Sequence, residues 1–324
     1  MSKARSVAVV IPSWNSRELL PRCLDSLRAQ GVEIELLVVD NGSSDGSVDY
    51  LRAEGVPHMS LSGNSGFAAA VNLGAARVSA PSILALNADT ALEPGCVGAL
   101  ADALDADPSL GGAQPLILQL KGGAGDRPDL TAARLYSVGQ ALLADGRAIE
   151  ESAGEPQRPE HLQRHEVFGV CGAACLLRRE LFDDLGGYDE RYFSFYEDVD
   201  LNVRARIAGW RFEYVPEAVV WHVGNASWTA GFDRPSAENA RLVARNRLAT
   251  QIKYMPLRSA PRIAAVEVGS LARAASQKRL RPTLRGKLAV LPWLRQLIAD
   301  RRRLRHEGDP ERARRWLGVR TDRC

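Results

Sequence analysis

The chain has 324 residues, of which 45% are hydrophobic and 25% are charged, and its formal net charge is +3. This length and balance suit a soluble protein with one large α/β domain and an appendage. No apolar run approaches the roughly 18 residues of a membrane span. The apolar run Val7 to Ile11 ends at Pro12, too early for a secretory signal. We therefore expect a cytoplasmic protein.

The charge is unevenly distributed along the chain. Residues 1–233 contain 19 Lys and Arg against 32 Asp and Glu, a balance of −13, whereas residues 234–324 contain 23 against 7, a balance of +16. A basic segment of this kind can bind nucleic acid, anionic lipid or an acidic substrate, or it can be a solvated face. No recognisable nucleic-acid module accompanies it, so we expect no nucleic-acid partner.

The first third of the chain alternates between strand and helix patterns. Strands are predicted at residues 7–11, 35–40, 58–61 and 82–89, and helices at residues 19–27, 47–55, 66–79 and 95–106. Alternation of this kind predicts βαβ units and a mostly parallel sheet with helices on both faces. In such sheets ligands bind at the carboxyl ends of the strands.

Those carboxyl ends are polar, since "PSWNS", "DNGSSDGS" and "NADT" follow the first, second and fourth strands. The third strand leads into "GNSGFAAA", a turn at a helix N-terminus that suits an anion or is a plain turn. Neither a Rossmann fingerprint nor a P-loop occurs. A ligand at this edge would therefore be held without a standard dinucleotide or P-loop motif.

The middle of the chain is less regular. Residues 113–148 predict hairpins, and residues 150–166, which are charged and poor in apolar side chains, predict a mobile surface loop. A strand, a short helix that ends at Gly186-Gly187, an aromatic turn and a strand pair within residues 211–224 are expected next. From Ser236 the pattern indicates basic helices interrupted by five prolines.

The stretch "SFYEDVDLNVRARIAGW", residues 194–210, carries the carboxylates Glu197, Asp198 and Asp200. Its periodicity fits a strand as well as a helix. We favour a helix from about Glu197 to Ala208, because acids at its front and arginines at its back complement the helix dipole, and Gly209 supplies a stop. On these residues alone, N-terminal capping by the acids is favoured over a catalytic base.

Five segments together resemble one known family. They read "VVIPSWNSRELLPRCLDSL", "LLVVDNGSSDGS", "GNSGFAAAVNLG", "LALNADT" and "GGYDERYFSFYEDVDLNVRARIAGW…VVWHVGNAS". In this order they are similar to the inverting family 2 glycosyltransferases of the GT-A fold, above all to bacterial rhamnosyltransferase-like members that build cell-surface polysaccharide. The resemblance spans residues 7 to about 228 and makes catalysis the preferred interpretation of the acids.

The resemblance implies a GT-A type nucleotide-diphospho-sugar transferase fold, an α/β fold with a mostly parallel central sheet flanked by helices. It implies a catalytic domain at residues 1–233, with a nucleotide-sugar half at about 1–112 and an acceptor half at about 113–233. Residues 234–324 would form a basic α-helical C-terminal extension.

The resemblance also assigns residues to a nucleotide pocket. In the family, the acid that closes the second strand contacts the nucleotide base, which implies this role for Asp40, with a turn aspartate as the alternative. Four more residues would complete the pocket or serve packing and turns instead: Pro12, Trp14, Gly66 and Asn72.

The family's D-x-D motif, which holds a divalent metal on the donor diphosphate, reads Asn87-Ala88-Asp89 here. One carboxylate is lost, so Asp89 would carry the ionic ligation, and Asn87 would offer an amide oxygen or a contact to the donor. His222 matches a histidine that is a further metal ligand in some members. Asp89 and His222 together imply a site for Mn²⁺ or Mg²⁺.

The acids fall where the family places its catalytic base. The resemblance implies that Asp198 takes a proton from the acceptor hydroxyl and that Glu197 orients the site or the acceptor. Asp200 is expected to cap the helix.

The implied function is a metal-dependent inverting glycosyltransferase that moves a sugar, foremost rhamnose from dTDP-rhamnose, onto a cell-surface glycan or polyprenyl-diphosphate-linked acceptor. The alternatives are another donor, such as UDP-galactofuranose or UDP-glucose, and a non-catalytic nucleotide-sugar binder, which the Asn87 departure suggests. A nucleotidyltransferase would need a Gly- and Arg-rich phosphate loop after the first strand, and "IPSWNSREL" is not one.

The C-terminal extension has an apolar pattern at helical spacing within residues 281–305, formed by Leu284, Leu288, Leu291, Leu294 and Ile298. A helix of this kind lies on an anionic bilayer or packs on the acidic catalytic domain. The first alternative implies a peripheral location at the inner face of the plasma membrane.

Overall fold

Alternating strands and helices build the first part of the fold. The computed structural model describes residues 6–120, 130, 133–224 and 236–319. The chain begins with β1 (Ser6–Ser13), α1 (Leu20–Arg28), β2 (Glu33–Asp40), α2 (Ser47–Ala53), β3 (His58–Ser60), α3 (Gly66–Ala75), β4 (Ser82–Leu86), β5 (Thr90–Leu92) and α4 (Cys96–Ala106). The strand predicted at residues 82–89 begins where it was expected but ends three residues earlier, at Leu86. Strand β4 ends at a turn in which Thr90 donates its backbone N–H to the carbonyl of Asn87.

The second part contains β6 (Leu110–Gln119), β7 (Leu135–Ser137), β8 (Gln140–Leu142), β9 (Ala148–Glu150), β10 (His165–Val167), β11 (Ala174–Arg178), α5 (Arg179–Asp184), α6 (Glu197–Ala208) and β12 (Arg211–His222). The predicted helix bounds of α6 are confirmed. The strand pair predicted within residues 211–224 is wrong, because β12 is one strand whose register on β6 shifts between Val215 and Val219. Pro216 lies in this shift and has no N–H to donate to a neighbouring strand.

The surface loop predicted at residues 150–166 is confirmed only in part. Most of it is irregular and lies between β9 and β10, but it contains the short 3₁₀ helix η2 (Pro159–Leu162), and Glu151 and His161 are buried. The ring of His161 accepts the backbone N–H of Arg158 and lies 3.2 Å from Ser152 Oγ, and Tyr214 donates its hydroxyl to the His161 carbonyl. Polar contacts of this kind leave no hydrophobic pattern in a sequence.

One sheet holds most of the strands, in the order β10-β12-β6-β11-β4-β1-β2-β3, with β5 on β12 and β7 on β6. Strands β4, β1, β2 and β3 run parallel to one another, and β12 runs parallel to β6. Strand β11 is antiparallel to both of its neighbours. Strands β8 and β9 form a separate hairpin.

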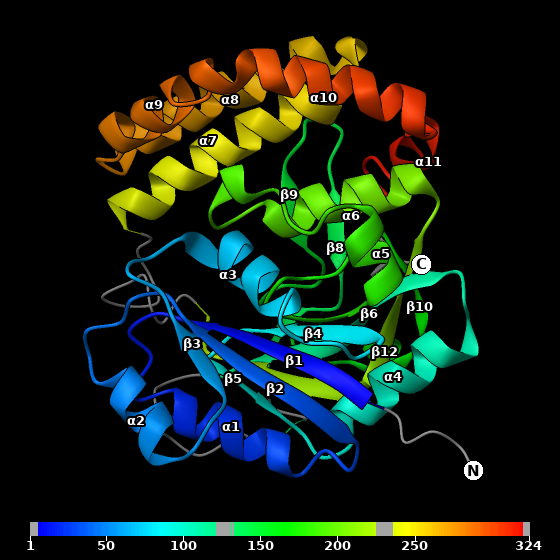
Figure 1. Cartoon of the computed structure of the whole chain (residues 1–324). Coiled ribbons are helices and arrows are strands. Elements are labelled where there is room, and N and C mark those ends of the chain that lie inside the picture. Colours follow the sequence, from blue (N-terminus) through cyan, green and yellow to red (C-terminus); the bar gives the residue numbers. More distant parts are fainter. Residues whose placement is uncertain (1–5, 121–129, 131–132, 225–235, 320–324) are drawn as a thin grey trace.

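Helices cover both faces of the sheet (Figure 1). Along β1, Val7, Val9 and Ile11 pack with α1, α2 and α4, whereas Ala8 and Val10 pack with α3, α5 and α6. This alternation follows from the period of two residues in a strand. The sheet is therefore buried on both faces, and its carboxyl edge is left for a ligand.

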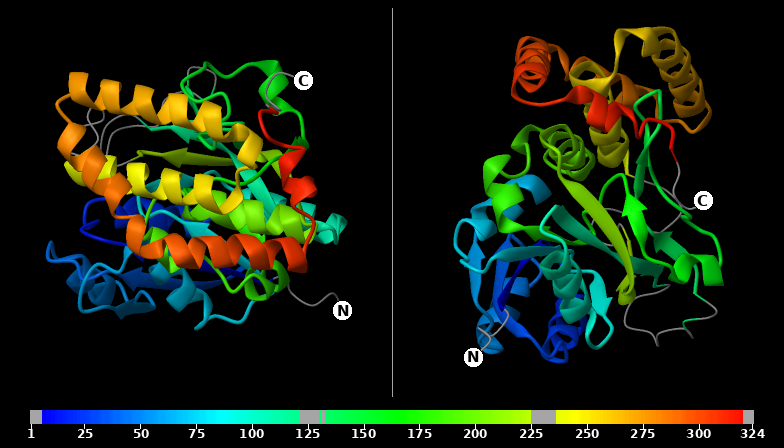
Figure 2. Two further views of the ribbon diagram at one scale, coloured as in Figure 1. Left: turned by 90° about the horizontal axis from the view of Figure 1, so that it is seen from above. Right: turned by 90° about the vertical axis from the view of Figure 1, so that its right-hand side faces the viewer.

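The remaining helices form an outer layer. They are α7 (Ala237–Tyr254), α8 (Ala260–Ser276), α9 (Leu280–Leu288), α10 (Leu294–Glu307) and α11 (Pro310–Arg314). Figure 2 shows this layer over α6, on the side away from the sheet. The single helix expected from the apolar pattern within residues 281–305 is wrong, because the 3₁₀ turn η5 (Leu291–Trp293), which contains Pro292, separates α9 from α10. The predicted domain boundary at residue 233 lies outside the described residues.

A buried ionic cluster joins the outer layer to the rest. Asp200 is fully buried and accepts hydrogen bonds from Lys253 Nζ at 2.7 Å, Tyr254 Oη at 2.6 Å and Arg204 Nε at 2.7 Å. The expectation that Asp200 caps α6 is therefore wrong, since its side chain binds α7 instead.

No helix in the described part of the chain is long and apolar enough to cross a membrane.

Candidate active site

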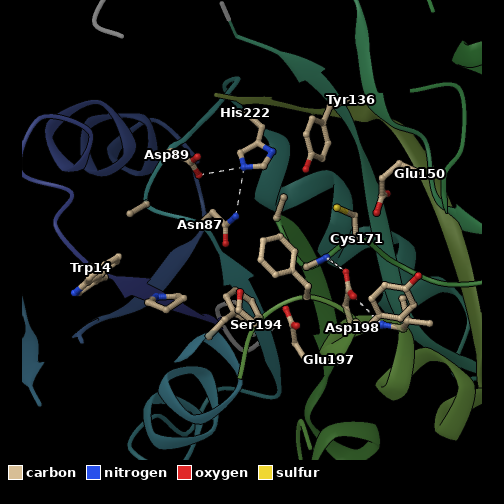
Figure 3. Close-up of a pocket in the computed structure, with 18 of the residues that line it drawn as sticks. Trp14, Asn87, Asp89, Tyr136, Glu150, Cys171, Ser194, Glu197, Asp198 and His222 are labelled. Carbon is tan, nitrogen blue, oxygen red and sulfur yellow. Dashed lines mark hydrogen bonds and ion pairs between the residues drawn. The ribbon is translucent and has the colours of Figure 1, made fainter. Parts of the chain in front are cut away.

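A cavity of about 300 Å³ opens at the carboxyl edge of the sheet. Trp14 follows β1, Asn41 follows β2 and Asp89 follows β4, and all three line it. The opposite wall comes from β7, β8, β9 and the segment that leads into α6 (Figure 3). Val243 of α7 also lines the cavity, so the outer helical layer takes part in the site.

The predicted nucleotide residues divide into two groups. Pro12, Trp14, Asn87 and Asp89 line the cavity, but Asp40 does not. Asp40 Oδ2 accepts the backbone N–H groups of the following turn, from Gly42 and Ser43, and Oδ1 is buried without a partner among the described residues. Asp40 Oδ1 can therefore accept a further hydrogen bond, and the next residue, Asn41, lines the cavity.

Gly66 and Asn72 also lie outside the wall of the cavity. A Cβ at Gly66, where φ is +88°, would collide with the carbonyl oxygen of Phe193. The amide of Asn72 accepts the Tyr188 N–H at 2.9 Å and donates to the Tyr188 carbonyl at 2.9 Å. Both residues thus hold the segment that leads to Glu197, which is the packing alternative considered for them.

Asp89 and His222 meet at one end of the cavity, although 133 positions separate them in the sequence. Strand β5 pairs with β12 and sets Thr90 opposite His222. His222 Nε2 lies 3.1 Å from Asp89 Oδ1 and 3.3 Å from Asn87 Nδ2, as Figure 3 shows. The Tyr136 ring packs edge-on against the imidazole, with 4.4 Å between the ring centroids. A carboxylate and an imidazole are thus held close together and face the cavity.

Asp198 lies at the other end of the cavity, at the start of α6. Its Oδ2 accepts hydrogen bonds from Gln140 Nε2 at 2.7 Å and from the Gly172 backbone N–H at 2.9 Å. Gln140 Nε2 also lies 2.9 Å from Glu150 Oε1, so one amide bridges two carboxylates. Asn202 donates to Gln140 Oε1 and fixes the orientation of that amide.

Burial changes the acidity of these carboxyl groups. It raises the pKa of Asp198. Burial and then the charge of Asp198 raise the pKa of Glu197 well above its usual value and that of Glu150 to about 7. A carboxylate with a raised pKa binds a proton more strongly, which suits a general base near neutral pH.

The sequence did not reveal Gln140, Glu150 or Tyr136 as site residues. They lie on strands of three residues each, β8, β9 and β7, and runs of that length carry no periodicity. Glu150 also began the predicted surface loop. No local sequence pattern marks them.

The fold is shared with solved glycosyltransferases. The structure of GalNAc-T7 with UDP, GalNAc and Mn²⁺ is similar with a TM-score of 0.60 at 16% identity, covering 78% of this chain and 49% of the other. The mannosyltransferase PcManGT from Pyrobaculum calidifontis, in complex with GDP-Man and Mn²⁺, gives a TM-score of 0.51 at 18% identity, covering 94% and 86%. The fold is therefore of the GT-A type, and the predicted fold class is confirmed.

The sequence comparisons narrow this class to a family. The model of glycosyl transferase family 2 matches residues 8–186, so the chain belongs to this family and is a glycosyltransferase. It is 32% identical over 232 residues to the N-acetylglucosaminyl-diphospho-decaprenol L-rhamnosyltransferase of Mycobacterium tuberculosis, covering 66% of this chain and 75% of the relative. It is 31% identical over 222 residues to the pre-mycofactocin glycosyltransferase of the same species, covering 67% and 43%. The predicted relation to rhamnosyltransferases is confirmed.

Proposed function

We propose that this glycosyltransferase moves rhamnose from dTDP-rhamnose, with inversion, onto a glycan carried by a polyprenyl diphosphate. The observation that carries the proposal is the placement of Asp198 in a cavity whose other end holds Asp89 and His222. The relative from Mycobacterium tuberculosis supports the sugar and the lipid-linked acceptor, because its name states both.

Asp198 acts as the general base. Gln140 and the Gly172 N–H hold its Oδ2, so the carboxylate is fixed before the acceptor binds. It takes the proton of the acceptor hydroxyl while that oxygen attacks the anomeric carbon from the side opposite the leaving diphosphate. Glu197, one residue earlier, also lines the cavity and orients the acceptor.

Asp89 and His222 would hold Mn²⁺ or Mg²⁺ beside the donor diphosphate. Their carboxylate and imidazole lie 3.1 Å apart and are almost fully buried. A carboxylate suits either ion, whereas the imidazole favours Mn²⁺ over Mg²⁺, which prefers oxygen ligands. Two protein ligands are typical of ions that keep substrate phosphates as further ligands. When bound, the ion offsets the charge that develops on the departing nucleotide. Both neighbouring structures contain Mn²⁺ with a nucleotide or a nucleotide sugar.

The enzyme works at the inner face of the plasma membrane and contributes to the cell wall or surface polysaccharide. Nine of the twelve large apolar residues that are exposed in the described part of the chain lie on the outer helical layer. They are Leu257, Val268, Leu280, Leu284, Leu288, Leu291, Leu294, Ile298 and Val319. The five residues of the predicted apolar pattern are among them, so α9 and α10 pack inward through other side chains, including Val290 and Leu297.

A donor screen tests the proposal. The purified protein is given dTDP-rhamnose, UDP-galactofuranose or UDP-glucose with a lipid-linked acceptor, and release of the nucleoside diphosphate is measured with and without Mn²⁺. We expect release from dTDP-rhamnose alone, and only with the ion. Release from another donor would mean that the enzyme transfers a sugar other than rhamnose. Binding of nucleotide sugars without any turnover would favour the non-catalytic alternative.

A further inference from the structure

The segment that leads into α6 has an unusual backbone. Phe193, Phe195 and Tyr196 all have positive φ, at 66°, 68° and 70°. At Phe193 ψ is −66°, and Ser194 donates its N–H to the Tyr192 carbonyl at 2.7 Å, which makes a γ-turn of the rare, strained kind. A bulky residue in such a conformation is strained and persists only when its surroundings impose that conformation. Residues 192–196, the aromatic turn, therefore need firm partners.

Asn246 of α7 supplies most of these partners. Its Nδ2 lies 2.8 Å from the Tyr192 carbonyl oxygen, 2.8 Å from that of Ser194 and 2.7 Å from that of Phe195. An amide nitrogen has two N–H groups, so three oxygens converge on two donors. Such convergence requires the folded-back backbone of the aromatic turn. Asn246 is fully buried, so no water replaces these bonds.

Arg245 fixes the orientation of that amide. Its Nε donates to Asn246 Oδ1 at 2.9 Å, and its Nη2 donates to the Tyr192 carbonyl at 2.8 Å. The guanidinium is stacked 4.6 Å from the centroid of Trp293, between α9 and α10. The fourth carbonyl, of Phe193, accepts the N–H of Ala68 from α3 at 3.2 Å. Every carbonyl from Tyr192 to Phe195 thus has a donor outside the turn.

The aromatic turn is part of the candidate active site. Ser194, Phe195 and Tyr196 line the cavity, and Tyr196 is the residue before α6, whose first two positions are Glu197 and Asp198. A relaxed turn would move the start of α6 and with it the Asp198 carboxylate. Trp14, which is predicted to bind the nucleotide, and Asn41 line the cavity from other loops, at the carboxyl ends of β1 and β2.

We propose that Asn246 is a positioning residue for catalysis: by binding three carbonyls of the strained aromatic turn, it sets the position of Asp198 from the C-terminal extension. The proposal rests on the proposed role of Asp198 as the base. It gives one residue of the outer helical layer, Asn246, a part in positioning the base. A displacement of about 1 Å at a reacting group is enough to lower a rate by roughly 10²-fold.

The test compares Asn246→Ala with Gln251→Ala. Gln251 is also a buried amide on α7, and it donates to the Asp145 carbonyl at 2.8 Å, away from the aromatic turn. Both variants lose a buried hydrogen bond and should unfold at lower temperature. Well below that temperature, we expect Asn246→Ala to lower kcat by about 10- to 100-fold with donor Kd within about twofold of wild type. Gln251→Ala should keep a kcat close to wild type.

Hydrogen exchange and one further variant complete the test. Asn246→Ala should speed amide exchange in residues 192–198, and Gln251→Ala should not. Unchanged exchange in that segment, or equal kcat in the two alanine variants, would overturn the proposal. Asp198→Asn is measured beside them: if it keeps full activity, the proposed base is wrong, whereas an inactive Asp198→Asn with a fully active Asn246→Ala rejects the positioning role alone.

Discussion

The proposed reaction depends on the carboxylate of Asp198. If it acts only in the transition state, Asp198→Asn should lower kcat by roughly 10²–10⁴-fold and leave the donor Kd close to wild type. Steady-state kinetics and calorimetry with the donor measure the two quantities. Asp184→Asn, an exposed carboxylate on α5, is the matched control. If Asp198→Asn loses donor binding but keeps normal turnover, Asp198 has a structural role and is not the base.

Asp198 should set the acidic limb of the pH dependence. Burial raises the pKa of Asp198, and the base works only when deprotonated, so kcat should fall as the pH drops through a value above that of an ordinary aspartate. Burial and then the charge of Asp198 raise the pKa of Glu150 to about 7, so below that pH Glu150 is largely protonated beside the ionised Asp198. Glu150→Gln keeps a neutral group at this position and should therefore leave the acidic limb of the kcat profile in place. A limb that moves to lower pH in this variant would mean that Glu150 is charged when the base titrates.

The Asp89–His222 pair should decide the need for a metal ion. Asp89→Ala should nearly abolish transfer and weaken Mn²⁺ binding in the presence of nucleotide, because it removes the only carboxylate of the motif. Titration calorimetry measures ion binding independently of activity. Excess chelator should inactivate wild type, and addition of Mn²⁺ should restore it. Full activity of wild type in chelator would contradict a metal-assisted mechanism.

At the scale of elements, the N-terminal strands and helices could be predicted because each carries a repeating apolar pattern. The bounds of α6 were predicted instead from the acids at its front, the arginines at its back and Gly209, because its periodicity also fits a strand. The sequence could not show that β12 is continuous, since Pro216 reads as a break. Hairpins were expected within residues 113–148, and β8 and β9 form one there, but no local pattern showed that this hairpin supplies Gln140 and Glu150 to the cavity.

The candidate site was predictable only where a motif marks it. Asn87, Asp89, Asp198 and His222 were all expected and all line the cavity. Asn246 carries no local signal, because its task is defined by three carbonyl groups about 50 positions earlier in the chain. Contacts between distant polar groups are fixed by the fold and not by neighbouring residues.

The junction of α6 and α7 should contribute strongly to stability. Burial raises the pKa of Asp200, but Lys253 and Arg204 outweigh it and hold that pKa well below the usual range. Asp200→Asn leaves Lys253 buried beside fewer charges and should cost about 3–5 kcal/mol at pH 7. Urea unfolding measures this loss. The double variant Asp200→Asn with Lys253→Met should be less destabilised than the single one.

The pH dependence of this junction has a definite sign. A carboxyl whose pKa is depressed in the folded state contributes stability above its unfolded pKa of about 4, and the contribution is lost as the pH falls below that value. The difference between wild type and Asp200→Asn should therefore shrink below about pH 4. Equal stability of the two proteins at pH 7 would contradict a structural role for the cluster.

At the scale of the whole molecule, the outer helical layer should bind anionic membranes. Leu288 and Leu291 are 62% and 63% exposed, so the double variant Leu288→Glu with Leu291→Glu should fold normally but no longer sediment with anionic liposomes. Leu162→Glu, at a residue 52% exposed on η2, is the control and should bind as wild type does. Salt at 1 M should release wild type, because it shortens the Debye length to about 3 Å.

Two results would contradict the membrane interface. Wild type that ignores anionic liposomes at low salt would leave α9 and α10 with packing alone. Binding to neutral and anionic vesicles alike would mean that the +16 charge balance of residues 234–324 plays no part. If the leucine variants instead abolished a dimer in gel filtration, the exposed face would belong to a second copy of the chain.

Two acidic side chains in the first turn of α6 face different neighbours. Asp198 and Asp200 are two residues apart, which turns one side chain about 200° from the other around the helix axis. Asp198 is bound to Gln140 of β8, and Asp200 is bound to Lys253 of α7. The helix is thus locked against rolling, since any rotation that re-aimed Asp198 would pull Asp200 from its cations. Asp198 should therefore meet every acceptor at the same fixed angle, so that only hydroxyl groups presented along that direction can react.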